Sequence, residues 1–250
     1  CLPGARMSKP VSKKNRGAKK KRSIRIRPGK ILFDLLLCFL ALTVVPVLIY
    51  STANPSTTML MWIRWVESDY NDKMPLAFMH WKRIDEISPY LIKAVVAAED
   101  QKYFKHKGFD WQAIESAIKV NLTTDRKIGA STISMQTSRN VFLWQERTWL
   151  RKALETYFTF LIETFWDKGR IMEVYLNVIE WGDGIYGCEA AAREYFNHSC
   201  ATLSPVEAAG LAAILPNPRG WSLHRPGKYV NHRRAKILNT LDHIRLPRLD

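Results

Sequence analysis

The sequence predicts an all-α protein in which one helical domain follows a single N-terminal transmembrane helix. Three observations support this fold class. A basic segment leads into an apolar run of twenty residues, apolar side chains recur at helical spacing from residue 88 almost to the end of the chain, and Ser or Asp residues precede several of these runs. A chain of 250 residues has room for one sizeable domain and a short appendage.

The excess positive charge lies at the N-terminus. The formal net charge is +15, yet residues 1–30 contain twelve Lys or Arg and no Asp or Glu, and the remainder holds 26 basic and 23 acidic side chains. The basicity is therefore a property of a tail. Polybasic tails bind anionic lipids or nucleic acid, but membrane topology alone accounts for this charge, and we expect no nucleic-acid partner. Residues 1–6, before Met7, are interpreted as a non-native or mis-annotated start.

Residues 31–50 form the predicted transmembrane anchor. About twenty apolar residues span the hydrocarbon core of a bilayer, and this run is interrupted by Asp34 near one end and Pro46 near the other. A basic flank keeps its own end in the cytoplasm, which places residues 51–250 on the outer face. A cleaved signal peptide is the competing interpretation. It is less favoured because the run exceeds a typical signal core and no small-x-small site follows.

Residues 51–87 are predicted to link the anchor to the domain. The apolar and aromatic side chains over residues 59–65 can rest at the membrane interface or pack against the domain core, and both alternatives stay open. A short strand is predicted over residues 76–84. The domain itself is predicted to occupy residues 88–250.

The helices of the domain follow from spacing and capping residues. Ser88-Pro89 begins a run that ends at Glu99, and Asp110 can cap a second helix. Ser204-Pro205-Val206-Glu207 is a capping box that opens a helix reaching Ile214. Two further helices are predicted over residues 149–165 and 171–178, and a glycine-rich loop over residues 181–187.

Glu99 is the candidate general base. It stands at the C-terminal end of its predicted helix, where the helix dipole disfavours the charged form of a carboxylate and makes it a better proton acceptor. The segment around it combines carboxylates, a histidine and aromatic residues in the order Glu99-Asp100-Gln101-Lys102-Tyr103-Phe104-Lys105-His106-Lys107-Gly108-Phe109-Asp110. A solvated Glu-Asp pair at a helix end is the alternative.

A loop of small hydroxyl residues and a group of cations follow. Residues 129–136 can offer backbone N–H groups, hydroxyls and an amide to a sugar or a phosphate. Four cations then occur within fourteen residues, namely Arg139, Arg147, Arg151 and Lys152. Guanidinium groups bind phosphate oxygens with paired hydrogen bonds, so this cluster suits a diphosphate. The alternative is a solvated basic helix face on which Arg151 pairs with Glu155.

Together these segments resemble the family 51 glycosyltransferases of bacterial peptidoglycan synthesis, over roughly residues 75–225. The Glu99 segment resembles that family's acidic motif, with Tyr103 where the family has Phe. Residues 129–140 are similar to its second motif, with four replacements at Ala130, Ser134, Met135 and Arg139. Arg151-Lys152-x-x-Glu155 resembles the third motif, and Tyr175-Leu176-Asn177 with the following glycine loop resembles the fourth. With the anchor and the short chain, the likeness is greatest to the monofunctional biosynthetic transglycosylases of Gram-negative bacteria.

The resemblance implies a lysozyme-like α-helical fold with two lobes and a cleft. It also implies that lipid II is polymerised into β-1,4 glycan strands, with inversion and release of undecaprenyl diphosphate, on the periplasmic side of the bacterial inner membrane. Glu99 would deprotonate the acceptor hydroxyl. Glu155 would act at the leaving group, either by holding Mg²⁺ or Mn²⁺ or by assisting departure. The cations that would stabilise the diphosphate are Arg139, Arg147 and Arg151, and the other substrate contacts would come from Asp100, Ser131, Gln136 and Asn140.

Two other functions stay open. A glycan-cleaving enzyme of lysozyme-like fold also uses two carboxylates across a cleft, although the cations and the anchor suit a lipid diphosphate better. A non-catalytic membrane scaffold would use the basic tail and the aromatic juxtamembrane segment to recruit partners, without dependence on Glu99. A transpeptidase is set aside, because Ser116-x-x-Lys119 has no Lys-Thr-Gly or Ser-x-Asn companion.

The expected partners are lipid II, the growing glycan strand, membrane lipids and other cell-wall synthases, and no organic cofactor is expected. Cys188 and Cys200 lie in the exported part, where disulfides form. Their pairing is one option, since spacing alone does not prove it. No Cys-x-x-Cys pattern or clustered Cys and His suggests a zinc site.

Overall fold

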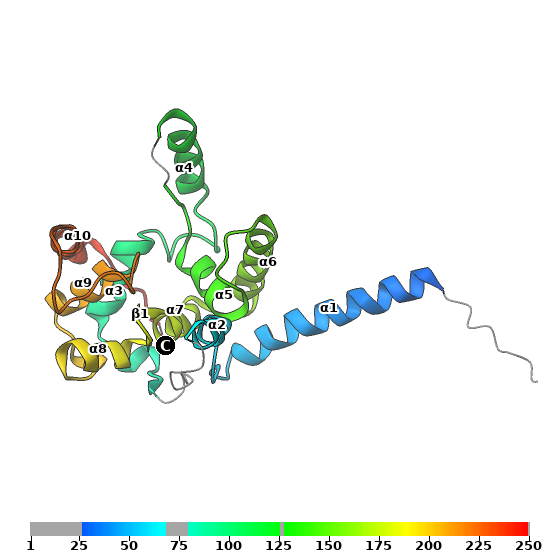
Figure 1. Ribbon diagram of the computed structural model, residues 1–250, viewed down its shortest axis with the longest axis horizontal. Coiled ribbons are helices and arrows are strands. Elements are labelled where there is room, and N and C mark those ends of the chain that lie inside the picture. Colours follow the sequence, from blue (N-terminus) through cyan, green and yellow to red (C-terminus); the bar gives the residue numbers. More distant parts are fainter. Residues whose placement is uncertain (1–26, 69–79, 126–127, 250) are drawn as a thin grey trace, which may run out of the picture. The chain divides into compact units, whose positions relative to one another are not determined.

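The computed structural model describes residues 27–68, 80–125 and 128–249, and most of them are helical (Figure 1). The all-α fold class with one long apolar N-terminal helix is confirmed. The chain divides into two compact units, the first ending at Phe39 and the second beginning at Leu40. The second unit holds every candidate site residue, and its division into two lysozyme-like lobes stays a prediction.

Helix α1 (Pro28–Tyr50) contains the predicted anchor. Its 23 residues are long and apolar enough to cross a membrane, and no second helix of that kind occurs among the described residues. The last turns of α1 belong to the second unit. Val47 is fully buried there, and its carbonyl accepts a 2.7 Å hydrogen bond from Trp166 Nε1. Arg170 Nε donates to the carbonyl of Tyr50 at 3.0 Å, so the body includes the end of the anchor helix.

Helix α2 (Met59–Glu67) combines the two alternatives that its composition left open. Thr58 caps it by accepting the N–H of Met61. Leu60 and Met61 are buried, and α2 packs against α5. Met59 and Trp62 stay exposed, so one face belongs to the core and the other is free to meet a membrane.

The strand predicted over residues 76–84 is wrong for residues 80–84, and residues 76–79 lie outside the described part of the chain. The N–H of Lys82 donates to Asn177 Oδ1 and the N–H of Ile84 to Glu173 Oε2, both at 2.9 Å. Side chains therefore take the N–H groups that a neighbouring strand would need. A 3-10 turn, η2 (Ile84–Glu86), begins at this point.

The predicted helices of the domain are all present, and the predicted glycine loop is a two-stranded hairpin. In chain order the further described elements are α3 (Pro89–Glu99), α4 (Trp111–Thr123), α5 (Ile133–Phe142), α6 (Trp149–Phe165), α7 (Lys168–Val178), β1 (Glu180–Gly182), β2 (Ile185–Tyr186), α8 (Cys188–Phe196), η3 (Cys200–Thr202), α9 (Pro205–Ile214), α10 (Lys228–Thr240) and η4 (Leu241–His243). The strands pair antiparallel, with Glu180 opposite Tyr186. Helix α9 is apolar except for Glu207 in its first turn and packs against α3 and α10, while α7 packs against α5, α6 and α8.

A short turn next to α8 is held by one buried carboxylate. Glu189 accepts the N–H of Cys200 at 2.9 Å and the hydroxyl of Ser199 at 2.8 Å, and it pairs with Arg193. Burial alone would raise the pKa of Glu189, but these donors lower it to about 2. The Sγ atoms of Cys188 and Cys200 lie 3.4 Å apart as buried free thiols, and their disulfide stays a prediction.

We expect a truncated protein that starts at Leu40 to melt at a higher temperature than one that starts at Ser51. The shorter protein loses the burial of Val47 and two hydrogen bonds to α1 carbonyls. Losses of about 2–4 kcal/mol correspond to a melting temperature roughly 5–10 °C lower. Circular dichroism in one detergent measures both proteins, and equal melting temperatures would show that α1 ends outside the folded body.

Replacing Glu189 by Gln should destabilise the body in a pH-dependent way. The folded pKa of about 2 lies below the ordinary value of 4.5, so the carboxylate stabilises the fold above that ordinary value, and the contribution is lost as the pH falls toward 2. The shift corresponds to at most about 3 kcal/mol. Urea unfolding should therefore show a larger difference between wild type and variant at pH 7 than at pH 3. The exposed Glu115→Gln is the control, and a difference that does not change with pH would refute the assignment.

Candidate active site

Glu99 ends α3 and is held by two donors from distant parts of the chain. Arg233 Nη2, on α10, lies 2.8 Å from Glu99 Oε1 and also donates to the carbonyl of Ala98 at 3.2 Å. Gln136 Nε2, on α5, donates to Glu99 Oε2 at 3.0 Å. The Glu99 side chain is only 14% exposed. A cation therefore sits at the negative end of α3, where sequence reasoning considered the helix dipole alone.

Asp100 ties the Glu99 segment to the start of α5. Its Oδ2 accepts the N–H of Ile133, the first residue of that helix, at 3.1 Å, and both of its oxygens lie 3.0 Å from His106 Nε2. The hydroxyl of Thr132 donates to the carbonyl of Gly108 at 2.6 Å. The carboxylate of Asp100 is thus occupied within the protein, and the contact with substrate predicted for it stays a prediction.

Gly108 suits this connection because of its backbone conformation and its close neighbours. Its φ is +85°, which side-chain-bearing residues rarely adopt. A Cβ atom at this position would lie 2.9 Å from Thr159 Cγ2 and 3.0 Å from Glu163 Cγ. The glycine of the motif therefore allows the loop to pass closely over α6.

Two cavities are lined by the predicted site residues. Glu99 and Ser131 line the first, of about 250 Å³. Gln136, Arg139 and Asn140 line the second, of about 180 Å³. The amide of Gln136 donates to Glu99 and accepts a 3.2 Å hydrogen bond from the hydroxyl of Tyr175. The side chain is therefore fixed, and it connects the Glu99 carboxylate to the cavity that Arg139 lines.

Arg139 is a largely buried guanidinium without a partner. None of the described residues forms a hydrogen bond or an ion pair with it, and its Nε is completely shielded from solvent. Burial lowers the pKa of Arg139, and the nearby Glu155 carboxylate opposes that effect. A buried cation without a partner is costly, and an anionic ligand would remove the cost.

Glu155 is completely buried on α6 and is occupied by two cations. Arg151 Nη1 pairs with Glu155 Oε2, and Lys152 Nζ lies 2.6 Å from Oε1. Arg151 Nε also donates to the carbonyl of Glu146 at 2.7 Å. The Arg151–Glu155 pair considered as an alternative is therefore formed, but it is buried and not a solvated face. Arg147 lies exposed on the loop that precedes α6.

The carboxylate of Glu155 does not make a metal site by itself. Both of its oxygens are engaged with cations, which would repel a divalent ion. No group of three or more His, Cys, Asp or Glu side chains suited to a metal occurs in the described ranges. The residues present do not fit the divalent cation that the resemblance implies, and no chemical step is derived through it.

A buried hydroxyl pair joins α5 to α6 and so places the cations relative to Gln136. Ser138 Oγ lies 2.9 Å from Thr159 Oγ1, and Thr159 Oγ1 donates to the carbonyl of Glu155 at 2.6 Å. All three residues are buried. This contact therefore connects the helix that carries Gln136 and Arg139 to the helix that carries the Glu155 ion pairs.

Large apolar side chains are exposed on α4 and at both ends of α6. Trp111 and Leu122 on α4 are 72% and 81% exposed, and Trp149 on α6 is 92% exposed. Helix α4 projects from the other helices of the body (Figure 1). Exposed apolar groups of this size are typical of surfaces that meet a membrane or another protein.

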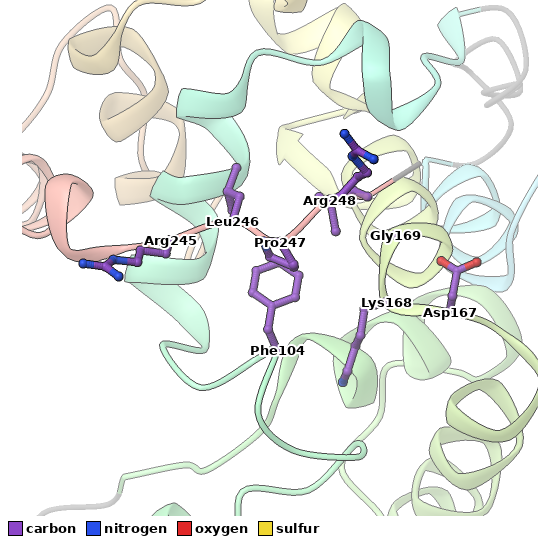
Figure 2. A pocket seen from close by; sticks show the side chains of 9 residues that line it. Phe104, Asp167, Lys168, Gly169, Arg245, Leu246, Pro247 and Arg248 are labelled. Carbon is purple, nitrogen blue, oxygen red and sulfur yellow. The ribbon is translucent and has the colours of Figure 1, made fainter.

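A further cavity, of about 540 Å³, lies elsewhere in the body. Figure 2 shows Phe104, Lys168 and the C-terminal residues 245–248 around it. None of the predicted site residues lines this cavity. It is therefore not part of the candidate active site.

Sequence reasoning missed three residues that the structure brings to the site, namely Arg233, Tyr175 as a partner of Gln136, and Glu180 in the second cavity. Arg233 and Glu99 are 134 residues apart. No spacing signal connects such positions, and the run of basic residues on α10 did not distinguish Arg233 from its neighbours. Tyr175 was noted only as part of a motif.

One family model and several known proteins match this chain. A family model described as transglycosylase matches residues 77–242. A biosynthetic peptidoglycan transglycosylase of Bdellovibrio bacteriovorus is 51% identical over 193 residues, covering 77% of each chain. Proteins of the same description from Caulobacter vibrioides and Bacteroides thetaiotaomicron are 48% and 46% identical, over 86% and 84% of this chain and 92% and 84% of theirs.

Proposed function

The chain belongs to the transglycosylase family, and we propose that it polymerises lipid II into β-1,4 glycan strands, with inversion at the sugar carbon and release of undecaprenyl diphosphate. The family and the names of the relatives support a glycosyltransferase of peptidoglycan synthesis. One observation carries the finer proposal. Gln136 joins the Glu99 carboxylate to the cavity that holds the unpaired guanidinium of Arg139.

Glu99 is proposed to be the general base. It lines a cavity together with Ser131, in which the acceptor sugar would bind with its 4-hydroxyl toward the carboxylate. Arg233 and Gln136 hold one carboxylate oxygen each. A positioned base within hydrogen-bond reach can remove the proton as the new bond forms. One displacement at an α-linked sugar diphosphate then yields a β linkage.

The diphosphate is proposed to bind at Arg139. Its oxygens would supply the anion that the buried guanidinium lacks among the described residues. Negative charge grows on the diphosphate as its bond to the sugar breaks, and a cation already fixed in place stabilises that charge without reorganisation. Arg147, Arg151 and Lys152 would add positive charge from the loop and from α6.

Glu155 is proposed to act through the cations that it holds. Because Arg151 and Lys152 occupy its oxygens, its contribution at the leaving group is to keep these two side chains in position. A divalent cation stays a proposal, the described residues build no site for it, and no step above depends on it. The remaining polar contacts to the sugars and the diphosphate are assigned to Asp100, Ser131, Gln136 and Asn140.

The location that fits this reaction is the bacterial cytoplasmic membrane, with the N-terminus in the cytoplasm and the catalytic domain in the periplasm. Helix α1 supports a membrane anchor. The exposed tryptophans of α4 and α6 are proposed to contact the lipid surface from which the lipid-linked substrate enters. The growing glycan strand and other cell-wall synthases stay proposed partners.

The two alternative functions gain no support from the site. A glycan-cleaving enzyme needs two carboxyl groups that act directly at the glycosidic bond, whereas the carboxylate of Glu155 is buried and occupied by two cations. A non-catalytic scaffold gives no reason for a buried arginine without a partner beside a positioned carboxylate.

Replacing Glu99 by Gln should reduce lipid II polymerisation by about a hundred- to ten-thousandfold, because the amide keeps the shape of the carboxylate but accepts no proton. Glycan formation by purified full-length protein in detergent measures the rate. Glu115→Gln, an exposed change on α4, is the matched control and should retain the wild-type rate. A folded Glu99→Gln protein that polymerises at the wild-type rate would falsify the assignment of the base.

Replacing Arg139 by Gln should lower the rate by about a hundred- to a thousandfold while stabilising the fold or leaving it unchanged. The rate falls because a fixed donor to the developing charge is lost. Stability does not fall because Arg139 Nε has no hydrogen bond to lose and the cost of burying the guanidinium exceeds its attraction to Glu155. Turnover and thermal unfolding are measured side by side, with the exposed Arg225→Gln as control. A variant that melts lower and turns over normally would show that Arg139 serves the fold and not the diphosphate.

A further inference from the structure

The cavity that Arg139 lines, of about 180 Å³, contains four buried polar atoms that have no hydrogen-bond partner among the described residues. Three of them are donors, namely Arg64 Nε, Arg139 Nε and Gln145 Nε2. Unsatisfied buried atoms are uncommon in folded proteins because each costs free energy. These donors come from α2, from α5 and from the loop that follows α5, and together they suit an anion whose oxygens accept hydrogen bonds from all of them.

Glu180 is the exception to this polarity. It begins β1, lines the same cavity and is only 7% exposed. Its Oε2 lies 3.3 Å from Arg64 Nε, whereas its Oε1 is the fourth atom without a partner. As a carboxylate, Glu180 places a negative charge beside the anion that the three donors favour. As a carboxylic acid, it carries no charge and becomes a fourth donor.

The surroundings of Glu180 act in opposite directions on its proton. Burial raises the pKa of Glu180, the guanidinium groups of Arg64 and Arg219 lower it, and Asp183 on the hairpin turn raises it. Tyr186, on β2, stays neutral because burial raises the pKa of its hydroxyl. An anion in the cavity would add a further negative charge and so favour the protonated form of Glu180.

We propose that Glu180 takes up a proton from solvent when the diphosphate binds, and that its carboxyl group then donates a hydrogen bond to a diphosphate oxygen. The charges balance in this complex. The diphosphate of a lipid-linked sugar is esterified at both ends and carries one negative charge on each phosphate, which Arg64 and Arg139 match, whereas an ionised Glu180 would cancel one of these cations. The inference rests on the proposed function, since it places the substrate diphosphate at Arg139.

Proton uptake makes substrate binding depend on pH in one direction. As the pH rises, the free protein loses the proton of Glu180 before the complex does, so binding must then draw that proton from solvent. Affinity therefore falls as the pH rises, by at most about tenfold per pH unit for one proton. A complex in which Glu180 stays ionised would show no such fall.

The test measures the binding of short-chain lipid II to full-length protein in detergent by isothermal titration calorimetry, between about pH 6 and pH 9. Two buffers with different ionisation enthalpies give the number of protons taken up at each pH. Wild type should take up more protons than Glu180→Gln, by as much as one. The amide of the variant is neutral at every pH, and with its oxygen toward Arg64 it turns an N–H₂ donor toward the cavity. At the upper end of the pH range the variant should therefore bind about three- to tenfold more tightly than wild type.

Glu67→Gln is the matched control. Glu67 also pairs with Arg64, at 2.7 Å from Nη1, but it is exposed and does not line the cavity. This variant should take up protons as wild type does. Glu180→Met also removes the titrating group, and it carries the measurement of proton uptake if Glu180→Gln does not fold.

The inference is overturned if wild type takes up no more protons than the Glu180 variants, or if the affinity of these variants falls with pH as steeply as that of wild type. Weaker binding by a folded Glu180→Gln than by wild type across the whole pH range would also overturn it. Failure of the proposed function would appear separately, as lipid II that binds to wild type with proton uptake but is not polymerised.

Discussion

The carboxylate of Asp100 is the contact on which the candidate site depends. It joins the end of α3, the His106 loop and the first N–H of α5. A carboxylate at a helix N-terminus satisfies a donor that the helix itself leaves open and interacts favourably with the helix dipole. Because Glu99 precedes Asp100 and Gln136 lies on α5, this contact connects the two elements whose side chains meet where Gln136 Nε2 donates to Glu99 Oε2 at 3.0 Å.

A second contact, between α5 and α6, positions the positive charge of the site. The hydroxyls of Ser138 and Thr159 connect α5 to α6, so Arg139 on one helix and the Glu155 ion pairs on the other keep their separation. Glu155 satisfies two cations and leaves Arg139 without a partner. The buried carboxylate of Glu155 therefore pairs with Arg151 and Lys152, and the guanidinium of Arg139 is left for a ligand. The oxygens of a diphosphate could bind this guanidinium.

A feature can be predicted from the sequence when the residues that determine it lie close together along the chain. The caps at Ser88, Asp110 and Ser204 are local and were predicted from a few neighbouring residues. The contact between Arg233 and Glu99 arises from the packing of α10 on α3, and no local sequence pattern predicts it. The strand prediction failed over residues 80–84 for the same reason, since Asn177 and Glu173 reach these N–H groups from α7.

The central claim is that one displacement, with Glu99 as base, joins an α-linked lipid diphosphate to an acceptor hydroxyl. The most direct test is the anomeric configuration of the glycosidic bonds that the purified protein makes from lipid II, determined by NMR together with the lipid product. The account predicts β linkages throughout and one undecaprenyl diphosphate released for each bond formed. Retained α linkages would contradict it, because retention requires a second displacement and a nucleophile that the account does not contain.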